Sequence, residues 1–190
     1  MILRTERLEL REMSEDDLPA LRRILHDPRA MTAYEGAFSE QETREWLQRM
    51  QRRYADDGFG LWACVLRATG TMVGQCGITR QRIDDDDVIE VGYLFEHAHW
   101  HRGYAVEAAM AARDWAFDTL GVDTVYAKVR STNVASMNVA IRLGMTVQRT
   151  FEVDYRGVRM PHLAFAIDRI RWEQLMEAQR AAASVREVGG

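Results

Sequence analysis

The sequence lacks the features that define several common classes of protein. It has two cysteines among 190 residues, Cys64 and Cys76, and they do not form a C-x-x-C pair. A disulfide framework is therefore not expected, and reduced thiols in a cytoplasmic protein are the default interpretation. No apolar run approaches the roughly 18–20 residues that cross a bilayer, and the charged residues 1–7 do not resemble a signal peptide. No membrane partner is expected.

An excess of positive charge is also absent. Lys and Arg number 25 against 29 Asp and Glu, which gives a formal net charge of −4. Nucleic acid is not an expected partner, because its binding needs a basic surface that displaces counterions. The hydrophobic and charged fractions, 47% and 28%, are ordinary for a globular domain. Without an internal repeat or a linker, the chain predicts a single domain over residues 1–190, with a core of residues 3–168 and a C-terminal helix and tail at 169–190.

The order of the predicted elements defines the fold class. After a strand at 8–11, capping patterns at residues 14–17 and 39–42 begin two helices. We then expect strands at 59–67, 71–79, 88–95 and 124–129, helices at 106–120 and 133–143, a closing strand pair at 146–154 and 159–167 around Arg156-Gly157, a helix at 169–180 and a fraying tail at 181–190. This order is α+β, with a mixed sheet that carries helices on its faces, because a doubly wound fold would alternate strands and helices throughout.

The most informative segment is the turn Trp100-His101-Arg102-Gly103-Tyr104-Ala105. It follows the strand-like run 88–95 and precedes the alanine-rich run 106–120. The first amides of a helix have no intrahelical partner, and the helix dipole favours negative charge there. A strand–turn–helix arrangement with small residues therefore predicts a phosphate-bearing ligand. No GxxxxGK[ST] segment and no Ser-His-Asp arrangement offers a competing chemistry.

Four segments together resemble the GCN5-related N-acetyltransferase (GNAT) family, especially its branch of ribosomal-protein alanine and serine N-terminal acetyltransferases. The segments are residues 5–11, 89–93 with 100–108, 133–136 with 142–145, and 155–157 with His162. Their order and spacing extend the resemblance over nearly the whole chain. It implies an acetyl-CoA-dependent enzyme with a mixed, mostly antiparallel sheet, a splayed central strand pair and helices on both faces.

By this resemblance, the turn binds the pyrophosphate of acetyl-CoA and the central strand pairs with the pantetheine arm. The implied cofactor-binding residues are Val91, Gly92, Tyr93, His101, Arg102, Gly103, Tyr104, Ala105 and Asn133. Gly103 and Ala105 are small, as the close approach of a diphosphate requires. Gly92 fits a bulge or a close backbone approach. His101 stands where the family often has glycine, which implies a stiffer or bulkier loop.

Acetyl transfer to an amine needs a base, a donor for the developing oxyanion and stabilisation of the thiolate. By resemblance Glu90 is the catalytic base, since it matches the glutamate of the histone-acetylating members. Alternatively, Glu90 is an ordinary polar residue on a strand. Glu152 and Asp154, near the closing strands, are alternative bases. The tyrosine that many members use as an acid would fall at Ala140 and is absent.

Ser136 is the candidate catalytic acid or water-orienting group. The N-terminal-acetylating branch has an Asn-x-x-Ser pattern, which this chain keeps as Asn133 and Ser136. Helix capping explains both residues equally well. The pattern His97, His99 and His101 lacks a carboxylate at a diagnostic spacing, so no metal is expected.

The sequence therefore predicts an N-acetyltransferase that transfers acetyl directly to a primary amine. A protein N-terminal α-amine is the favoured acceptor, because a neutral lysine amine costs about 4.6 kcal/mol at pH 7 and a neutral α-amine only about 1 kcal/mol. A small-molecule amine (polyamine, antibiotic or amino acid) is one alternative. A non-catalytic acyl-CoA-binding regulatory module, suggested by the missing tyrosine, is another. The oligomeric state is open, a homodimer included.

Overall fold

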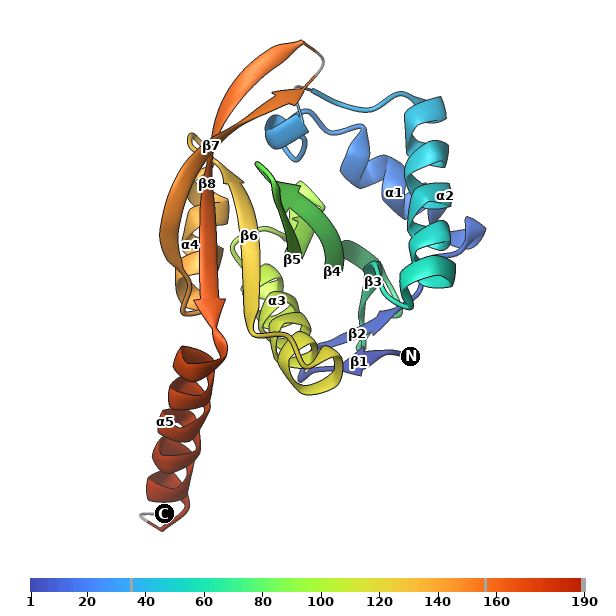
Figure 1. Ribbon diagram of the computed structural model, residues 1–190. Helices are drawn as coiled ribbons and strands as arrows, with labels where there is room; N and C mark the ends of the chain where they lie inside the picture. Colours follow the sequence, from blue (N-terminus) through green and yellow to red (C-terminus); the bar gives the residue numbers. More distant parts are fainter. Residues whose placement is uncertain (35, 156, 189–190) are drawn as a thin grey trace.

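The computed structural model describes residues 1–34, 36–155 and 157–188. Its strands form one sheet in the order β1-β2-β3-β4-β5-β6-β8-β7, antiparallel except between β5 and β6 (Figure 1). The strands are β1 (Leu3–Arg4), β2 (Leu8–Arg11), β3 (Leu61–Leu66), β4 (Met72–Ile83), β5 (Asp86–Phe95), β6 (Thr124–Arg130), β7 (Thr146–Tyr155) and β8 (Val158–Asp168). The predicted α+β class with a mixed, mostly antiparallel sheet is confirmed.

Helices cover both faces of this sheet. They are α1 (Leu18–Leu25), α2 (Glu40–Asp57), α3 (Tyr104–Trp115), α4 (Val134–Arg142) and α5 (Arg169–Val188). Alternate residues of β3 divide the core, because Trp62 packs in the cluster under α3 whereas Leu61 and Ala63 pack in the cluster under α1 and α2. In α3, Ala108 and Ala112 are fully buried, so small side chains let this helix approach the sheet closely.

The C-terminal helix differs from the prediction. α5 continues to Val188 instead of ending near residue 180, so the expected fraying tail is wrong over most of its length. The alanines at 181–183 have high helix propensity, which the tail interpretation underrated. α5 extends away from the sheet (Figure 1).

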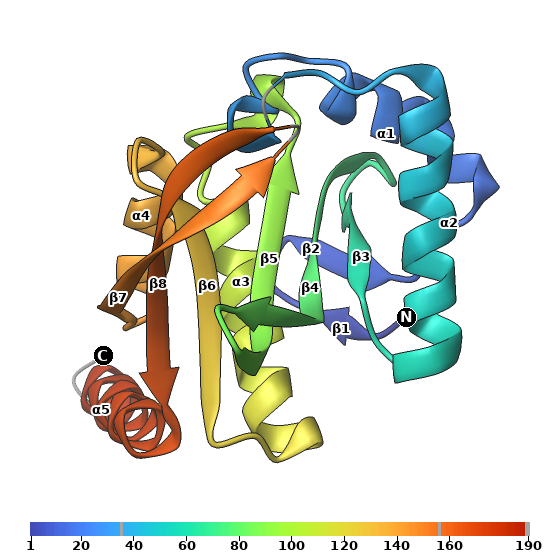
Figure 2. The same cartoon turned by 45° about the horizontal axis from the view of Figure 1, so that its top comes forward.

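The central strands β5 and β6 pair at one position in the described chain, Glu90 with Tyr126. Beyond Glu90 they diverge (Figure 2), which confirms the predicted splay and leaves the β6-facing backbone of residues 91–93 without a partner strand. The pairing of β4 with β5 is continuous through Gly92, so this glycine forms no bulge. Its close neighbour is a side chain, since an added Cβ would lie 3.1 Å from Leu61 Cδ2.

The β7–β8 hairpin curves over the sheet towards the loop between α1 and α2 (Figure 1). The rings of Tyr34, in that loop, and Tyr155, at the end of β7, meet edge to face with centroids 5.7 Å apart. Arg156, part of the predicted turn, lies outside the described residues. Among the described residues, no helix is long and apolar enough to cross a membrane.

Candidate active site

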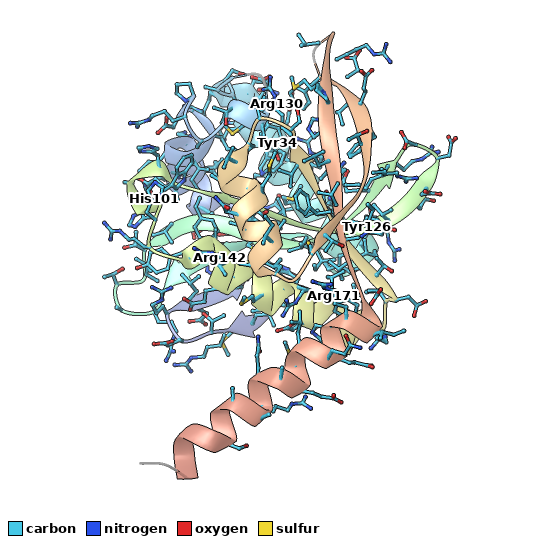
Figure 3. The ribbon with its side chains drawn as sticks, turned by 90° about the vertical axis from the view of Figure 1, so that its left-hand side faces the viewer. Tyr34, His101, Tyr126, Arg130, Arg142 and Arg171 are labelled. Carbon is cyan, nitrogen blue, oxygen red and sulfur yellow. The ribbon has the colours of Figure 1, made fainter. Side chains whose placement is uncertain are left out.

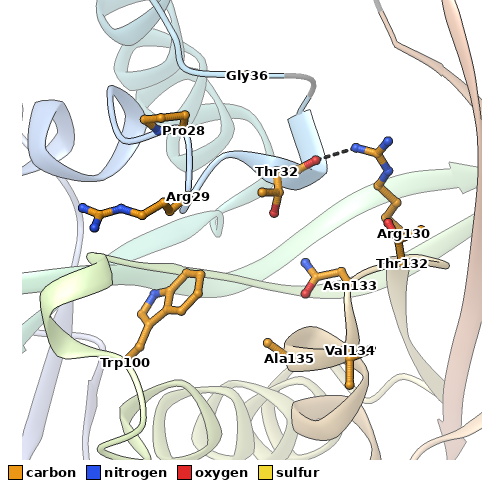
Figure 4. A pocket seen from close by; sticks show the side chains of 10 residues that line it. All are labelled: Pro28, Arg29, Thr32, Gly36, Trp100, Arg130, Thr132, Asn133, Val134 and Ala135. Atoms are coloured by element: carbon orange, nitrogen blue, oxygen red, sulfur yellow. Dashed lines mark hydrogen bonds between the residues drawn. The ribbon is translucent and has the colours of Figure 1, made fainter.

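The gap between β5 and β6 opens into a cavity of about 710 Å³. Its walls come from the loop between α1 and α2, from α2, β4, β5, β6 and α4, from the 99–106 turn and from the β7–β8 hairpin. A hollow of about 600 Å³ adjoins this cavity and shares five lining residues with it, Thr32, Trp100, Arg130, Asn133 and Ala135 (Figure 4). Arg130 donates a hydrogen bond to the Thr32 carbonyl, which ties the end of β6 to the α1–α2 loop.

The turn before α3 presents a row of unused backbone donors. Gly103 is the N-cap residue, with φ of 80°. The first backbone hydrogen bond of the helix runs from the Glu107 amide to the Gly103 carbonyl, at 3.0 Å. The amides of residues 101–106 donate to no acceptor within the described part of the chain. Consecutive free amides at a helix N-terminus suit a phosphate group.

Trp100 and His101 in the turn have definite structural roles. The Trp100 indole Nε1 donates to the Phe95 carbonyl at 2.9 Å, which closes the turn against the end of β5. His101 has φ of 59°, in the left-handed region that glycine favours, and its side chain is exposed. The histidine therefore keeps the backbone shape that a glycine would adopt.

The segment before β2 holds this turn from the side. Thr5 Oγ1 and Arg7 Nε donate to the Glu107 carboxylate at 2.5 and 2.6 Å. Arg7 Nη1 also donates to the Arg102 carbonyl at 2.9 Å, and the guanidinium lies 4.6 Å from the centre of the Tyr104 ring. Burial alone would raise the pKa of Glu107, but the hydrogen bonds from Thr5 and Arg7 outweigh it and lower the pKa.

Glu90 is partly buried on β5 and lines the cavity. Its Oε1 accepts a hydrogen bond from the Lys128 backbone amide at 3.2 Å. Burial raises the pKa of Glu90, and the nearby charges of Lys128 and Arg53 only partly oppose this. A carboxylate with a raised pKa in a cavity is suited to accept a proton from an amine.

The two alternative bases lie elsewhere. Side chains alternate along β7, and it is Val153 that lines the cavity. Glu152 instead pairs with Arg159 at 2.8 Å, and Asp154 accepts from the Gly157 amide at 3.0 Å. Neither carboxylate lines the cavity.

Ser136 takes part in the capping of α4 and also contacts Tyr93 across the gap. Its amide donates to Asn133 Oδ1 at 3.0 Å, so Asn133 does cap α4. The Tyr93 hydroxyl donates to the Ser136 carbonyl at 2.9 Å and lies 3.0 Å from Ser136 Oγ. Burial raises the pKa of Tyr93, so its hydroxyl stays protonated. Ala140, the position of the missing tyrosine, is fully buried.

The Tyr93 side chain was not predicted to take part, since only backbone contacts were assigned to this residue. It reaches Ser136 from another element, 43 residues away, so no local spacing reveals the contact. His162 was likewise noted in the sequence without a role. It is 8% exposed and lines the cavity.

The His162 ring has one defined tautomer when neutral. Nδ1 lies 2.9 Å from the Met160 carbonyl, which can only accept, so Nδ1 carries the proton and Nε2 can accept. Burial lowers the pKa of His162, so the neutral ring predominates at neutral pH. The ring is therefore a second proton acceptor in the cavity.

Two of the three histidines near the turn, His97 and His99, contact different aromatic rings. His97 packs against Trp100 with ring centroids 4.9 Å apart, and His99 lies 6.4 Å from Tyr104. In the part of the chain that the structure describes, no group of three or more His, Cys, Asp or Glu residues is arranged to hold a metal ion.

A splayed strand pair, a turn of free amides and a cavity with a partly buried carboxylate together define an acyl-CoA-dependent acyltransferase. The chain belongs to the GNAT acetyltransferase family, because residues 7–146 match the acetyltransferase (GNAT) domain model. It is therefore an N-acetyltransferase whose co-substrate is acetyl-CoA.

Individual relatives support this assignment. The uncharacterized protein YkkB of Bacillus subtilis (strain 168) is 39% identical over 147 residues, which cover 77% of this chain and 86% of YkkB. The crystal structure of an acetyltransferase from Agrobacterium tumefaciens strain C58 matches with a TM-score of 0.75 at 33% identity, over 88% of this chain and 94% of that one. The ribosomal-protein-S5-alanine acetyltransferase of Vibrio fischeri matches with a TM-score of 0.71 at 15% identity, over 90% and 97% of the two chains, which shows a shared fold.

Proposed function

We propose that this N-acetyltransferase transfers acetyl directly to a primary amine, and that its acceptor is a protein N-terminal α-amine. One observation carries the proposal: Glu90 and Ser136, from the two sides of the β5–β6 gap, line a single cavity that reaches the turn before α3. A base and a proton donor at one cleft suit direct transfer, with no covalent enzyme intermediate.

The residues of the cleft fit acetyl-CoA. The free amides of residues 101–106 would hold its pyrophosphate, and an added Cβ at Gly103 would meet Arg7 Nη2 at 3.3 Å, so the position has little spare room. The unpaired backbone of residues 91–93 would pair with the pantetheine arm, and Asn133 lies beside it at the start of α4. When bound, acetyl-CoA supplies an activated thioester.

The roles of the protein groups follow from their positions. Glu90 accepts a proton from the amine nitrogen, whose lone pair forms the new bond to the carbonyl carbon. A β5 amide facing the gap donates to the developing oxyanion. Ser136 Oγ, with the Tyr93 hydroxyl beside it, would pass a proton to sulfur as the carbon–sulfur bond breaks and regain one from water, while Glu90 releases its proton to solvent. An N-terminal α-amine suits this arrangement, because it needs less help to become neutral than a lysine amine.

The test measures CoA release from acetyl-CoA with a panel of N-terminal peptides, lysine-containing peptides with blocked N-termini, and small amines. We expect turnover with the N-terminal peptides. Because only the ionised Glu90 accepts a proton and burial raises its pKa, kcat should fall with decreasing pH at a value above the ordinary glutamate pKa. Glu90→Gln should lower kcat by about 100-fold or more where Glu90 is ionised in the wild type, should abolish the acidic limb, and should leave the Kd of acetyl-CoA unchanged.

His162→Asn is the matched control, since it removes the other proton acceptor of the cavity and should keep the acidic limb. Loss of that limb in His162→Asn and its persistence in Glu90→Gln would assign the base to His162. Turnover of small amines alone would reject the N-terminal acceptor. Binding of acetyl-CoA without CoA release from any amine would identify a regulatory module.

A further inference from the structure

The cavity of this acidic protein is strongly basic. The chain carries a net charge of −4, yet its cavity is lined by five cations, Arg49, Arg53, Lys128, Arg130 and Arg142. Among the described residues of the lining, Glu90 is the carboxylate that faces them. Such a concentration of one sign of charge indicates an anionic ligand.

Three of these cations have partners or lie on the cofactor side. Arg130 donates to the Thr32 carbonyl, and Lys128 Nζ donates to Gln81 Oε1 at 2.8 Å. Arg142 belongs to α4, on the same side of the molecule as His101 and the phosphate turn (Figure 3). Arg49 and Arg53 instead belong to α2, on the opposite face of the sheet, so the phosphates of acetyl-CoA do not account for them.

Arg53 is a half-buried guanidinium without a hydrogen-bond partner in the described part of the chain. It forms no hydrogen bond or ion pair with any residue that the structure describes. Burial lowers the pKa of Arg53, the like charge of Arg49 adds to this effect, and the nearby carboxylates of Glu90 and Asp57 only partly oppose it. A charge that is withdrawn from water without a hydrogen-bonded counter-ion is costly, and a bound anion would reduce that cost.

Arg49 lies one turn before Arg53 on the same face of α2 and is held in place by an aromatic ring. Its guanidinium lies 4.9 Å from the centre of the Trp46 ring. Trp46 in turn meets Tyr34 edge to face at 5.9 Å, and both rings line the cavity. The stacking fixes the position of Arg49 and leaves its N–H groups free to bind a carboxylate.

We propose that the acceptor carries a carboxylate near its reactive amine, and that Arg49 and Arg53 bind this carboxylate while Glu90 faces the amine. The proposal rests on the proposed function and names the chemistry of its acceptor. Two sources share this chemistry: an acidic side chain near a protein N-terminus, and the carboxylate of a free amino acid. The same positive charges favour the neutral form of the amine and disfavour a polyamine, whose further ammonium groups they repel.

Matched acceptor pairs test the proposal through CoA release. Peptides that carry Glu or Gln at the first or second position are compared, as are free glutamine and glutamine amide, which lacks the α-carboxylate, with spermidine as a cationic acceptor. We expect the Glu peptide to exceed its Gln partner in kcat/KM by about tenfold or more, as hydrogen bonds to a charged group imply. The peptide and amino-acid pairs then identify which source the enzyme uses.

Two variants make the assignment specific. Arg53→Gln should reduce the Glu-to-Gln preference to about one, chiefly through a higher KM for the acidic acceptor, while the KM of acetyl-CoA stays unchanged. Arg52→Gln is the control, because Arg52 carries the same charge at the preceding position of α2, is exposed and does not line the cavity. It should keep the preference.

The outcomes separate the two proposals. Equal rates within both acceptor pairs, a preference that survives Arg53→Gln, or faster turnover of spermidine would overturn the anionic acceptor and leave N-acetylation in place. CoA release with no member of the full amine panel would overturn the proposed function itself.

Discussion

At the scale of single residues, His101 shows how a side chain can occupy a position shaped for glycine. Its left-handed backbone, with φ of 59°, belongs to the turn of free amides. For a residue with a Cβ this conformation costs roughly 1–2 kcal/mol. The sequence predicted a bulkier loop at His101, because histidine replaces a frequent glycine of the family. The backbone angle could not be predicted, since it is imposed by the strand and helix on either side.

Replacing His101 should therefore stabilise the protein. We expect His101→Gly to raise the free energy of unfolding by about 0.5–1 kcal/mol, because the relief of the left-handed strain exceeds the entropy cost of glycine. Urea unfolding measures this change, and acetyl-CoA binding should persist. His97→Gly is the control, since His97 does not have a positive φ and should lose stability. A loss of stability in both variants would show that His101 is not strained.

At the scale of elements, local sequence patterns predicted the structure correctly, whereas contacts between distant segments could not be predicted. The predicted capping box of α2 is present, since Ser39 Oγ accepts from the Glu42 amide at 3.2 Å and Glu42 Oε2 accepts from the Ser39 amide at 2.7 Å. The support of α3 by the segment before β2 was not predicted, although both segments carried the family resemblance. Arg7 and Glu107 are 100 residues apart, and spacing alone cannot join them.

Removal of the Glu107 charge should weaken cofactor binding. Glu107→Gln keeps the size of the side chain but loses the ion pair that holds the turn, so we expect the Kd of acetyl-CoA to rise about fivefold while the fold is retained. Calorimetric titration measures the affinity. Glu6→Gln is the control, because Glu6 is exposed and directly precedes Arg7, the partner of Glu107, in the sequence.

The ion pair also predicts the sign of a pH effect. The pKa of Glu107 is lowered in the folded state, so its contribution to stability is present above the ordinary glutamate pKa and is lost as the pH falls through the lowered value. Thermal unfolding of Glu107→Gln should lack this acid-dependent component. Equal affinity and equal acid sensitivity in Glu107→Gln and the wild type would contradict a role for the pair.

At the scale of the whole molecule, the sequence predicted the order of elements and singled out the turn before α3, but it did not predict the far end of the cavity. The phosphate turn lies in one continuous segment, so its pattern is visible in the chain. The end of the cavity that we propose for the acceptor is assembled from Arg53 on α2, Tyr93 on β5 and His162 on β8. None of these side chains forms a local pattern with the others, and only the curvature of the sheet brings them to one cavity.

The splay that opens the cleft also limits the connection between its two sides. Strands β1 to β5 meet β6 to β8 at the Glu90–Tyr126 pair, and the contact of Tyr93 with Ser136 spans the same gap. This contact can act in two ways. It can hold α4 against β5, which affects stability, or it can orient the Ser136 hydroxyl towards the sulfur, which affects the rate.

Kinetics of Tyr93→Phe, Ser136→Ala and the double variant separate these two roles. We expect each single variant to lower kcat by about tenfold with little change in the KM of acetyl-CoA, and the double variant to be no slower than Ser136→Ala, because the two hydroxyls act as one unit. Tyr126→Phe is the control, since Tyr126 lies at the same gap but does not line the cavity (Figure 3). A lower melting temperature with unchanged kcat in Tyr93→Phe would show that the contact only joins the two sides of the sheet, and the proton donor would then have to be sought elsewhere in the cavity.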